Sequence, residues 1–172
     1  MKHGYIQVYT GNGKGKTTAA LGLALRAAGA GLKVFIAQFM KTGDYSEIQA
    51  LRHYATHITV EQFGLGRFIK GEPSTADISA AQSGLDAVRR ALTGGKYQIV
   101  IMDEGNVAAS LGLIAVEDLL SAMTMKPETV ELVITGRGAD LRVVAKADLV
   151  TEMNAVKHYY QAGVPARTGI EK

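Results

Sequence analysis

A glycine- and lysine-rich loop at residues 10–18 constrains this chain more than any other feature, and it reads TGNGKGKTT. Residues 5–9 before it alternate apolar and polar side chains, as a strand does. Residues 19–28 after it are good helix formers, small enough to pack closely on a sheet. Backbone N–H groups in such a loop converge on an anion, and the following helix adds its positive end. The placement predicts a phosphate-binding loop.

We expect the phosphate contacts to come from the consecutive residues Gly11, Asn12, Gly13, Lys14, Gly15, Lys16, Thr17 and Thr18. Lys16 adds a full positive charge, and Thr17 adds a hydroxyl that can face Mg²⁺. Thr10 stands where the usual pattern has its first glycine, and Gly11 and Gly13 can supply the positive-φ turn instead. The alternative, a flexible surface loop, is disfavoured by the strand-like and helix-like flanks.

Composition narrows the class of protein. The chain has 172 residues, 47% hydrophobic and 20% charged, which predicts one globular domain over 1–172 with no membrane span. It has no cysteine, which excludes disulfides and thiol catalysis and is compatible with the cytoplasm. The net charge of +3 comes from scattered basic residues, so we expect anionic ligands and no nucleic acid. The first strand begins so early that we expect no signal segment before it.

Strand-like and helix-like stretches alternate along the whole chain, which predicts an α/β fold, a three-layer P-loop (RecA-like) domain with a mostly parallel wound sheet. Leu21, Leu25 and Ala28 are expected to face the core from the first helix. After the first strand and helix, strands are expected over 33–39, 58–63, 98–102 and 130–135 and at 149–150. Further helices are expected over 46–54, from the Ser74/Thr75 cap to a stop at Gly94-Gly95, and over 116–123, with a polar tail to the end.

Two carboxylates follow the apolar run 99–102, at Asp103 and Glu104. Ligands of wound sheets gather at the carboxyl ends of strands, so one of them can hold Mg²⁺ opposite Thr17. Adjacent carboxylates cannot be ranked by sequence, and a solvated strand end is the alternative. The strand over 130–135 likewise ends in a Gly-Arg-Gly loop, where Arg137 either meets phosphate or is a solvated surface residue.

Several segments together resemble one family, the P-loop-type ATP:corrinoid adenosyltransferases, which act on cob(I)alamin or cob(I)yrinic acid a,c-diamide. The resemblance covers nearly the whole chain. It rests on residues 9–20 (YTGNGKGKTTAA), 34–41 (VFIAQFMK), 102–104 (MDE), 133–138 (VITGRG), 162–164 (AGV) and 166–171 (ARTGIE).

The resemblance implies transfer of the 5′-deoxyadenosyl group of ATP to the Co(I) of a reduced corrinoid, with release of triphosphate. Co(I) is itself a strong nucleophile, so the protein needs no general base. Lys16 and Glu104 would be the catalytic residues. Glu104 and Thr17 would hold Mg²⁺, with Asp103 as the second candidate ligand.

The resemblance also implies contacts with ATP and the corrin from residues outside the phosphate loop. Arg26, which by pattern alone belongs to a solvated helix face, would contact the nucleoside end of ATP. Phe63 and Phe68 are the candidates for contact with the corrin, and core packing is their alternative. A homodimer is expected from the family, and a reductase would supply Co(I).

Two other function classes share the nucleotide site. A RecA-like ATPase module would hydrolyse ATP to drive a partner, and it would need a residue that positions water. A nucleotide-binding regulatory protein would bind ATP without catalysis and would need no corrinoid.

Overall fold

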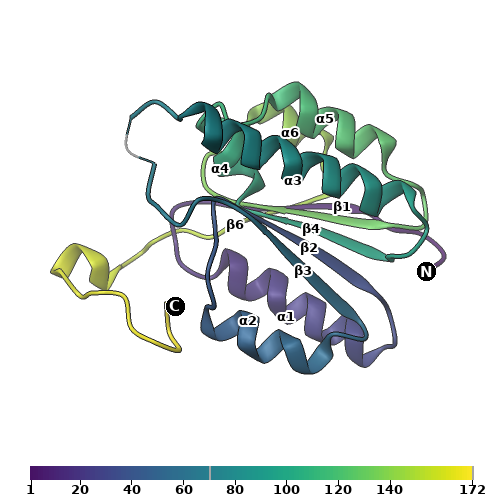
Figure 1. The fold of residues 1–172 in the computed structure, drawn as a ribbon, viewed down its shortest axis with the longest axis horizontal. Helices are drawn as coiled ribbons and strands as arrows, with labels where there is room; N and C mark the ends of the chain where they lie inside the picture. Colours follow the sequence, from purple (N-terminus) through teal and green to yellow (C-terminus); the bar gives the residue numbers. More distant parts are fainter. Residues whose placement is uncertain (70, 172) are drawn as a thin grey trace.

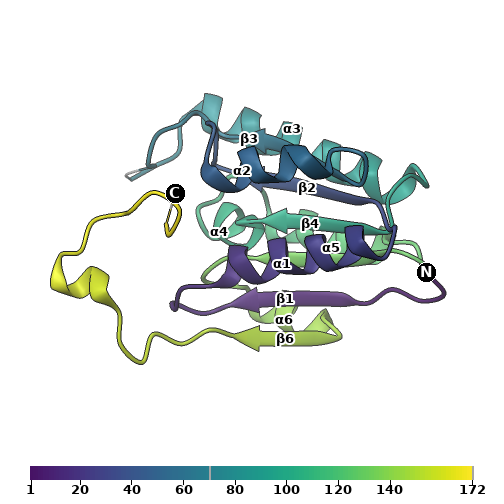
Figure 2. The same cartoon turned by 90° about the horizontal axis from the view of Figure 1, so that it is seen from below.

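The computed structural model describes residues 1–69 and 71–171 and shows an α/β fold built on one six-stranded sheet (Figure 1). All neighbouring strands run parallel, in the order β3-β2-β4-β5-β1-β6 (Figure 2). The strands are β1 (Ile6–Thr10), β2 (Val34–Phe39), β3 (Ile58–Phe63), β4 (Ile99–Asp103), β5 (Glu131–Thr135) and β6 (Leu149–Glu152). The predicted fold class is confirmed.

Helices cover both faces of this sheet and make the three layers visible in Figure 1. One face carries α1 (Lys16–Gly29) and α2 (Ser46–Leu51), which the short helix η1 (Arg52–Tyr54) continues. The other face carries α3 (Thr75–Thr93), α4 (Gly105–Ser110), α5 (Val116–Met125) and α6 (Leu141–Lys146). Within the described ranges, no helix is both long enough and apolar enough to cross a membrane.

The central strands β2, β4 and β5 are buried along their whole length, as expected for parallel strands covered on both faces. Helix α1 packs on them through an alanine stripe, Ala20, Ala24, Ala27 and Ala28, which lets the helix approach the sheet closely. The prediction that Leu25 faces the core is wrong. It is 42% exposed, because it lies one helical step of about 100° from Ala24 in that stripe.

The longer elements lie where the pattern predicts them. The expected N-cap of α3 is confirmed, because Ser74 and Asp77 form a capping box. The helices α4 and α6 and the short helix η2 (Tyr159–Ala162) were not predicted. α4 and α6 span six residues each, too few to show a helical period, and α4 begins with the poor helix formers Gly105 and Asn106.

Candidate nucleotide site

The phosphate-binding loop joins β1 to α1 at the carboxyl edge of the sheet. Gly11 has φ 91° and Gly15 has φ 121°, so both occupy backbone conformations that favour glycine. The expectation of a positive φ is confirmed for Gly11, whereas Gly15, not Gly13, provides the second one. Gly13 is required by space instead, since a Cβ there would lie 2.7 Å from the carbonyl oxygen of Met153.

Lys16 lies at the centre of this loop, 7% exposed. Its Nζ donates to the carbonyl oxygens of Gly11 and Gly13, each at 2.7 Å. Burial lowers the pKa of Lys16, the nearby charge of Arg137 lowers it further, and Glu104 opposes both. A buried ammonium group that donates to two loop carbonyl oxygens can exchange those partners for phosphate oxygens.

The segment that follows β6 packs against the phosphate-binding loop. The Gly13 N–H donates to the Met153 carbonyl oxygen at 2.6 Å, and a Cβ at Gly11 would come within 2.5 Å of the same oxygen. Asn12 and Thr18 are exposed at the loop surface. The backbone at Met153 therefore fixes the loop conformation, a contact that sequence reasoning missed.

Asp103, at the end of β4, is 1% exposed and accepts four hydrogen bonds. Its Oδ1 accepts from the hydroxyls of Thr17 and Thr135, each at 2.8 Å. Its Oδ2 accepts from Lys41 Nζ at 2.8 Å and from Gln38 Nε2 at 3.2 Å. Both carboxylate oxygens are thus fully engaged inside the protein, which leaves Asp103 little capacity to bind a metal.

Glu104 differs from its neighbour in conformation and in partners. Its backbone is left-handed, with φ 62°, and its N–H donates to Thr135 Oγ1 at 3.0 Å. No hydrogen bond reaches its carboxylate from residues 1–69 or 71–171. Burial and the charge of Asp103 raise the pKa of Glu104, while Lys41, Lys16 and Arg137 lower it.

These two observations fit a magnesium ion held by Glu104 and Thr17. The Thr17 hydroxyl gives its hydrogen to Asp103, so its oxygen lone pairs are free for a cation. Nowhere in the described part of the chain do three or more His, Asp or Glu side chains gather as a metal cage. Mg²⁺ commonly takes one or two protein oxygens and completes its shell with phosphate and water.

Arg137 lies at the same edge, exposed, and its charge acts on both Lys16 and Glu104. Asn106 supports the loop that carries it, because Asn106 Nδ2 donates to the Gly136 carbonyl oxygen at 3.3 Å. The charge of Arg137 therefore acts on the phosphate loop, through Lys16, and on the end of β4, through Glu104.

Arg26 is also exposed but lies ten residues beyond Lys16 on α1, about 15 Å along the helix axis. Its role toward the nucleoside end of ATP stays a prediction.

Phe63 is half-buried, and its ring packs against Phe39 with 6.3 Å between the centroids. Phe68 is 91% exposed in the loop after β3. Of the two aromatic candidates, Phe68 is the one with a free ring face.

Lys14 reaches away from the loop to the end of the chain. Its Nζ donates to the Ile170 carbonyl oxygen at 2.7 Å and lies 3.5 Å from Glu171 Oε1. Figure 2 shows the segment after β6 extending outward and bending back. The closing segment quoted from the sequence thus ends against the phosphate loop.

Glu171 is the centre of the contacts within this tail. Hydrogen bonds from Arg167 and Tyr159 lower its pKa to about 2. Because this value is below the usual 4.5, the contacts stabilise the tail above pH 4.5 and are lost as the pH falls through about 2.

We expect carboxyl ¹³C NMR to give this low pKa of Glu171, and Arg167→Ala to raise it toward 4.5. The matched change Arg142→Ala should leave it in place, and a wild-type midpoint near 4.5 would contradict the contact.

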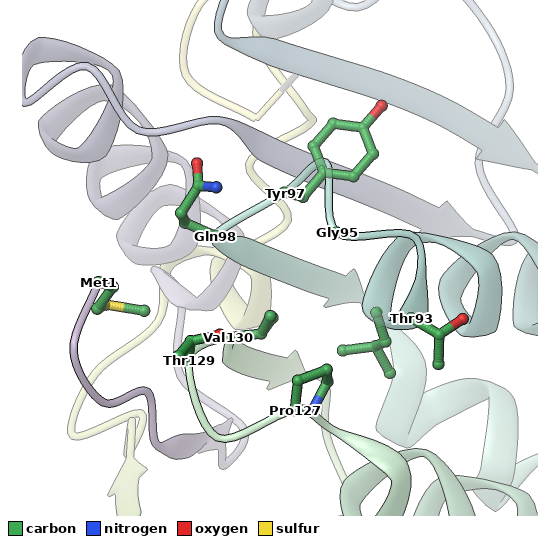
Figure 3. A pocket seen from close by; sticks show the side chains of 9 residues that line it. Met1, Thr93, Gly95, Tyr97, Gln98, Pro127, Thr129 and Val130 are labelled. Carbon is green, nitrogen blue, oxygen red and sulfur yellow. The ribbon is translucent and has the colours of Figure 1, made fainter.

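A cavity of about 460 Å³ lies at the opposite edge of the sheet, where β4 and β5 begin (Figure 3). Met1, Tyr97, Gln98 and Val130 are among the residues that line it. None of its lining side chains is charged, so it lacks the groups that hold a triphosphate. The phosphate loop, and not this cavity, is the candidate nucleotide site.

Comparison with known proteins shows the family of the chain. The family model described as ATP:corrinoid adenosyltransferase BtuR/CobO/CobP matches residues 2–171. A corrinoid adenosyltransferase of Pseudomonas aeruginosa is 32% identical over 171 residues, 99% of this chain and 84% of the relative. One of Escherichia coli is 34% identical over 171 residues, 99% of this chain and 86% of the relative. An uncharacterized protein of Nostoc sp. is 37% identical over 183 residues, 98% of this chain and 48% of the relative.

Proposed function

Because this chain belongs to the ATP:corrinoid adenosyltransferase family, we propose that the carboxyl edge of its sheet transfers the adenosyl group of ATP to a corrinoid. The observation that carries the proposal is the convergence of Lys16, Thr17 and Glu104 at one edge, within a chain matched by that family over residues 2–171. This arrangement suits the phosphate end of ATP.

The reaction places few chemical demands on the protein. The Co(I) of the reduced corrinoid donates an electron pair to C5′ of ATP, so that the Co–C bond forms. The C5′–O bond breaks, and triphosphate leaves with the bonding pair. No proton has to move, so the protein must align C5′ with cobalt and neutralise the departing charge. Lys16 and the loop N–H groups suit the second task, with Arg137 beside them.

Thr17 and Glu104 are the residues that would hold Mg²⁺, and the ion would supply further positive charge to the triphosphate. Two observations support this assignment: the Glu104 carboxylate accepts no hydrogen bond from the described residues, and the Thr17 hydroxyl donates to Asp103. Asp103, the second candidate ligand by sequence, accepts the hydrogen of that hydroxyl.

The remaining contacts are proposals from the family resemblance. Arg26 would contact the nucleoside end of ATP, and Phe68 and Phe63 would contact the corrin. We also propose a homodimer that works in the cytoplasm with a reductase that supplies Co(I). The exposed ring of Phe68 supports the corrin contact.

Analysis of the phosphorus products separates adenosyl transfer from ATP hydrolysis. With ATP, Mg²⁺ and chemically reduced cobalamin, we expect ³¹P NMR to show intact triphosphate, formed in step with a light-sensitive alkylcobalamin spectrum. Without corrinoid, the protein should be a poor ATPase, because the transferase mechanism needs no residue to aim water at the γ-phosphorus. Rapid release of ADP without corrinoid, and without adenosylated product when Co(I) is supplied, would favour the ATPase function instead.

A further inference from the structure

Asp103 connects four elements of the fold through one buried carboxylate. Its donors are Thr17 in the first turn of α1, Thr135 at the end of β5, Gln38 in strand β2 and Lys41, the second residue after β2. Of these four donors, only Lys41 carries a charge. Burial of a carboxylate destabilises the fold unless a charged partner compensates it, so the ammonium group of Lys41 offsets the desolvation of Asp103.

The position of Lys41 is built into the backbone. The residue before it, Met40, has φ 60°, a left-handed conformation that costs a side-chain-bearing residue energy. Gly64, the residue that follows β3, lies against this turn, and a Cβ there would lie 2.3 Å from the Met40 carbonyl carbon and 2.5 Å from the Lys41 nitrogen. The side chain of Lys41 is 23% exposed and that of Asp103 is 1% exposed. The turn at Met40 and the close approach of Gly64 together place the ammonium group of Lys41 beside the buried carboxylate of Asp103.

The contacts then run in sequence from Lys41 to the proposed metal ligand. Lys41 occupies Oδ2 of Asp103, and the Thr17 hydroxyl donates to Oδ1 of the same carboxylate. A hydroxyl has a single hydrogen, so this bond decides where its oxygen lone pairs face. Partners that orient a ligand from behind typically contribute about 10- to 100-fold to metal affinity.

We propose that Lys41 is a positioning residue of the metal site, which holds the Asp103 carboxylate so that Thr17 presents its oxygen to a divalent cation shared with Glu104. This inference rests on the proposed metal site and assigns Lys41 a role in it. Because Lys41 also occupies Oδ2, it keeps Asp103 out of direct metal binding, and the site has one carboxylate ligand.

Two other roles for Lys41 make different predictions. A lysine that touches the triphosphate directly would contribute to ATP affinity whether or not a metal is present. A lysine that only stabilises the fold would change the unfolding temperature and leave the metal dependence of ATP binding alone. Only the positioning role changes the increase in ATP affinity that Mg²⁺ produces, which we call the magnesium enhancement.

Calorimetry of ATP binding without corrinoid measures this quantity, once with saturating Mg²⁺ and once with EDTA. In Lys41→Met we expect the magnesium enhancement to fall about tenfold or more, with the affinity in EDTA within about twofold of the wild type. Lys41→Gln, which keeps a hydrogen-bond donor but removes the charge, should also show this fall. It can be measured in place of Lys41→Met if that variant does not fold. Lys96→Met removes an exposed lysine at the opposite edge and should leave the enhancement unchanged.

Each outcome decides between the roles. Equal losses in Mg²⁺ and in EDTA would identify a direct phosphate contact and overturn the inference. An unchanged enhancement in a folded variant would overturn it as well. A wild-type protein that shows no magnesium enhancement at all would instead refute the proposed metal site, and ³¹P analysis would still report independently on adenosyl transfer.

Discussion

Replacement of Lys16 by alanine is expected to lower ATP affinity at least tenfold and kcat/KM by about a hundredfold. Lys16 is 7% exposed and aims its ammonium group into the loop that receives the phosphates. One charged hydrogen bond to phosphate accounts for about 2 kcal/mol in the ground state. The charge that develops on the departing triphosphate adds to the loss in the transition state.

The neighbouring lysine provides a matched control. Lys14 is exposed, and its ammonium group is directed toward Ile170 and Glu171 instead of the loop. We therefore expect Lys14→Ala to weaken ATP binding clearly less than Lys16→Ala. Isothermal calorimetry gives the affinities, and thermal unfolding checks that the loop still folds without its two Lys16 hydrogen bonds. Near-normal ATP binding by folded Lys16→Ala would contradict the assignment of the phosphate loop.

Much of the fold could be predicted from the sequence because its longest elements have strong local signals. The buried runs of β2 and β4 are continuous and apolar, and the Ser74 cap marks the start of α3. The short helix α4 follows a left-handed residue, Glu104, and begins at a glycine, so local propensity argued against it. Its position is set by tertiary contacts with β5, α5 and β2.

The candidate site was predictable only where its residues are neighbours of a motif. Lys16 and Thr17 belong to the loop, and Asp103 and Glu104 directly follow an apolar strand. Nothing local separates the roles of the two carboxylates. Their difference comes from the left-handed turn at Glu104 and from donors on β2, β5 and α1, which depend on the strand order.

The contacts of Lys41 show the same limit. Lys41 follows a buried strand, which is a signal for a ligand-facing residue in a parallel sheet. Its partner Asp103 is 62 residues away, and only the adjacency of β2 and β4 brings the two together. The contact of Lys14 with Ile170 spans 156 residues and has no local signal at all.

Replacement of Glu104 by glutamine is expected to raise the Mg²⁺ concentration for half-maximal activity by about tenfold or more while the unfolding temperature stays close to that of the wild type. Glutamine keeps the shape of the side chain and removes its charge. The Glu104 carboxylate accepts no hydrogen bond from the described residues, so the fold loses little. Burial and Asp103 already raise the pKa of this carboxyl, and an approaching cation relieves that repulsion.

Asp103→Asn is the control that tells the two carboxylates apart. An asparagine at this buried position presents an NH₂ group to donors that face either Oδ1 or Oδ2, so about 3 kcal/mol of stability should be lost. We therefore expect Glu104→Gln to shift the Mg²⁺ titration alone. Asp103→Asn should lower the unfolding temperature and also shift the titration, because asparagine no longer holds the Thr17 hydroxyl in place. A titration that is unchanged in Glu104→Gln but shifted in folded Asp103→Asn would make Asp103 the metal ligand. If neither variant shifted the titration, no metal would be held at this strand end.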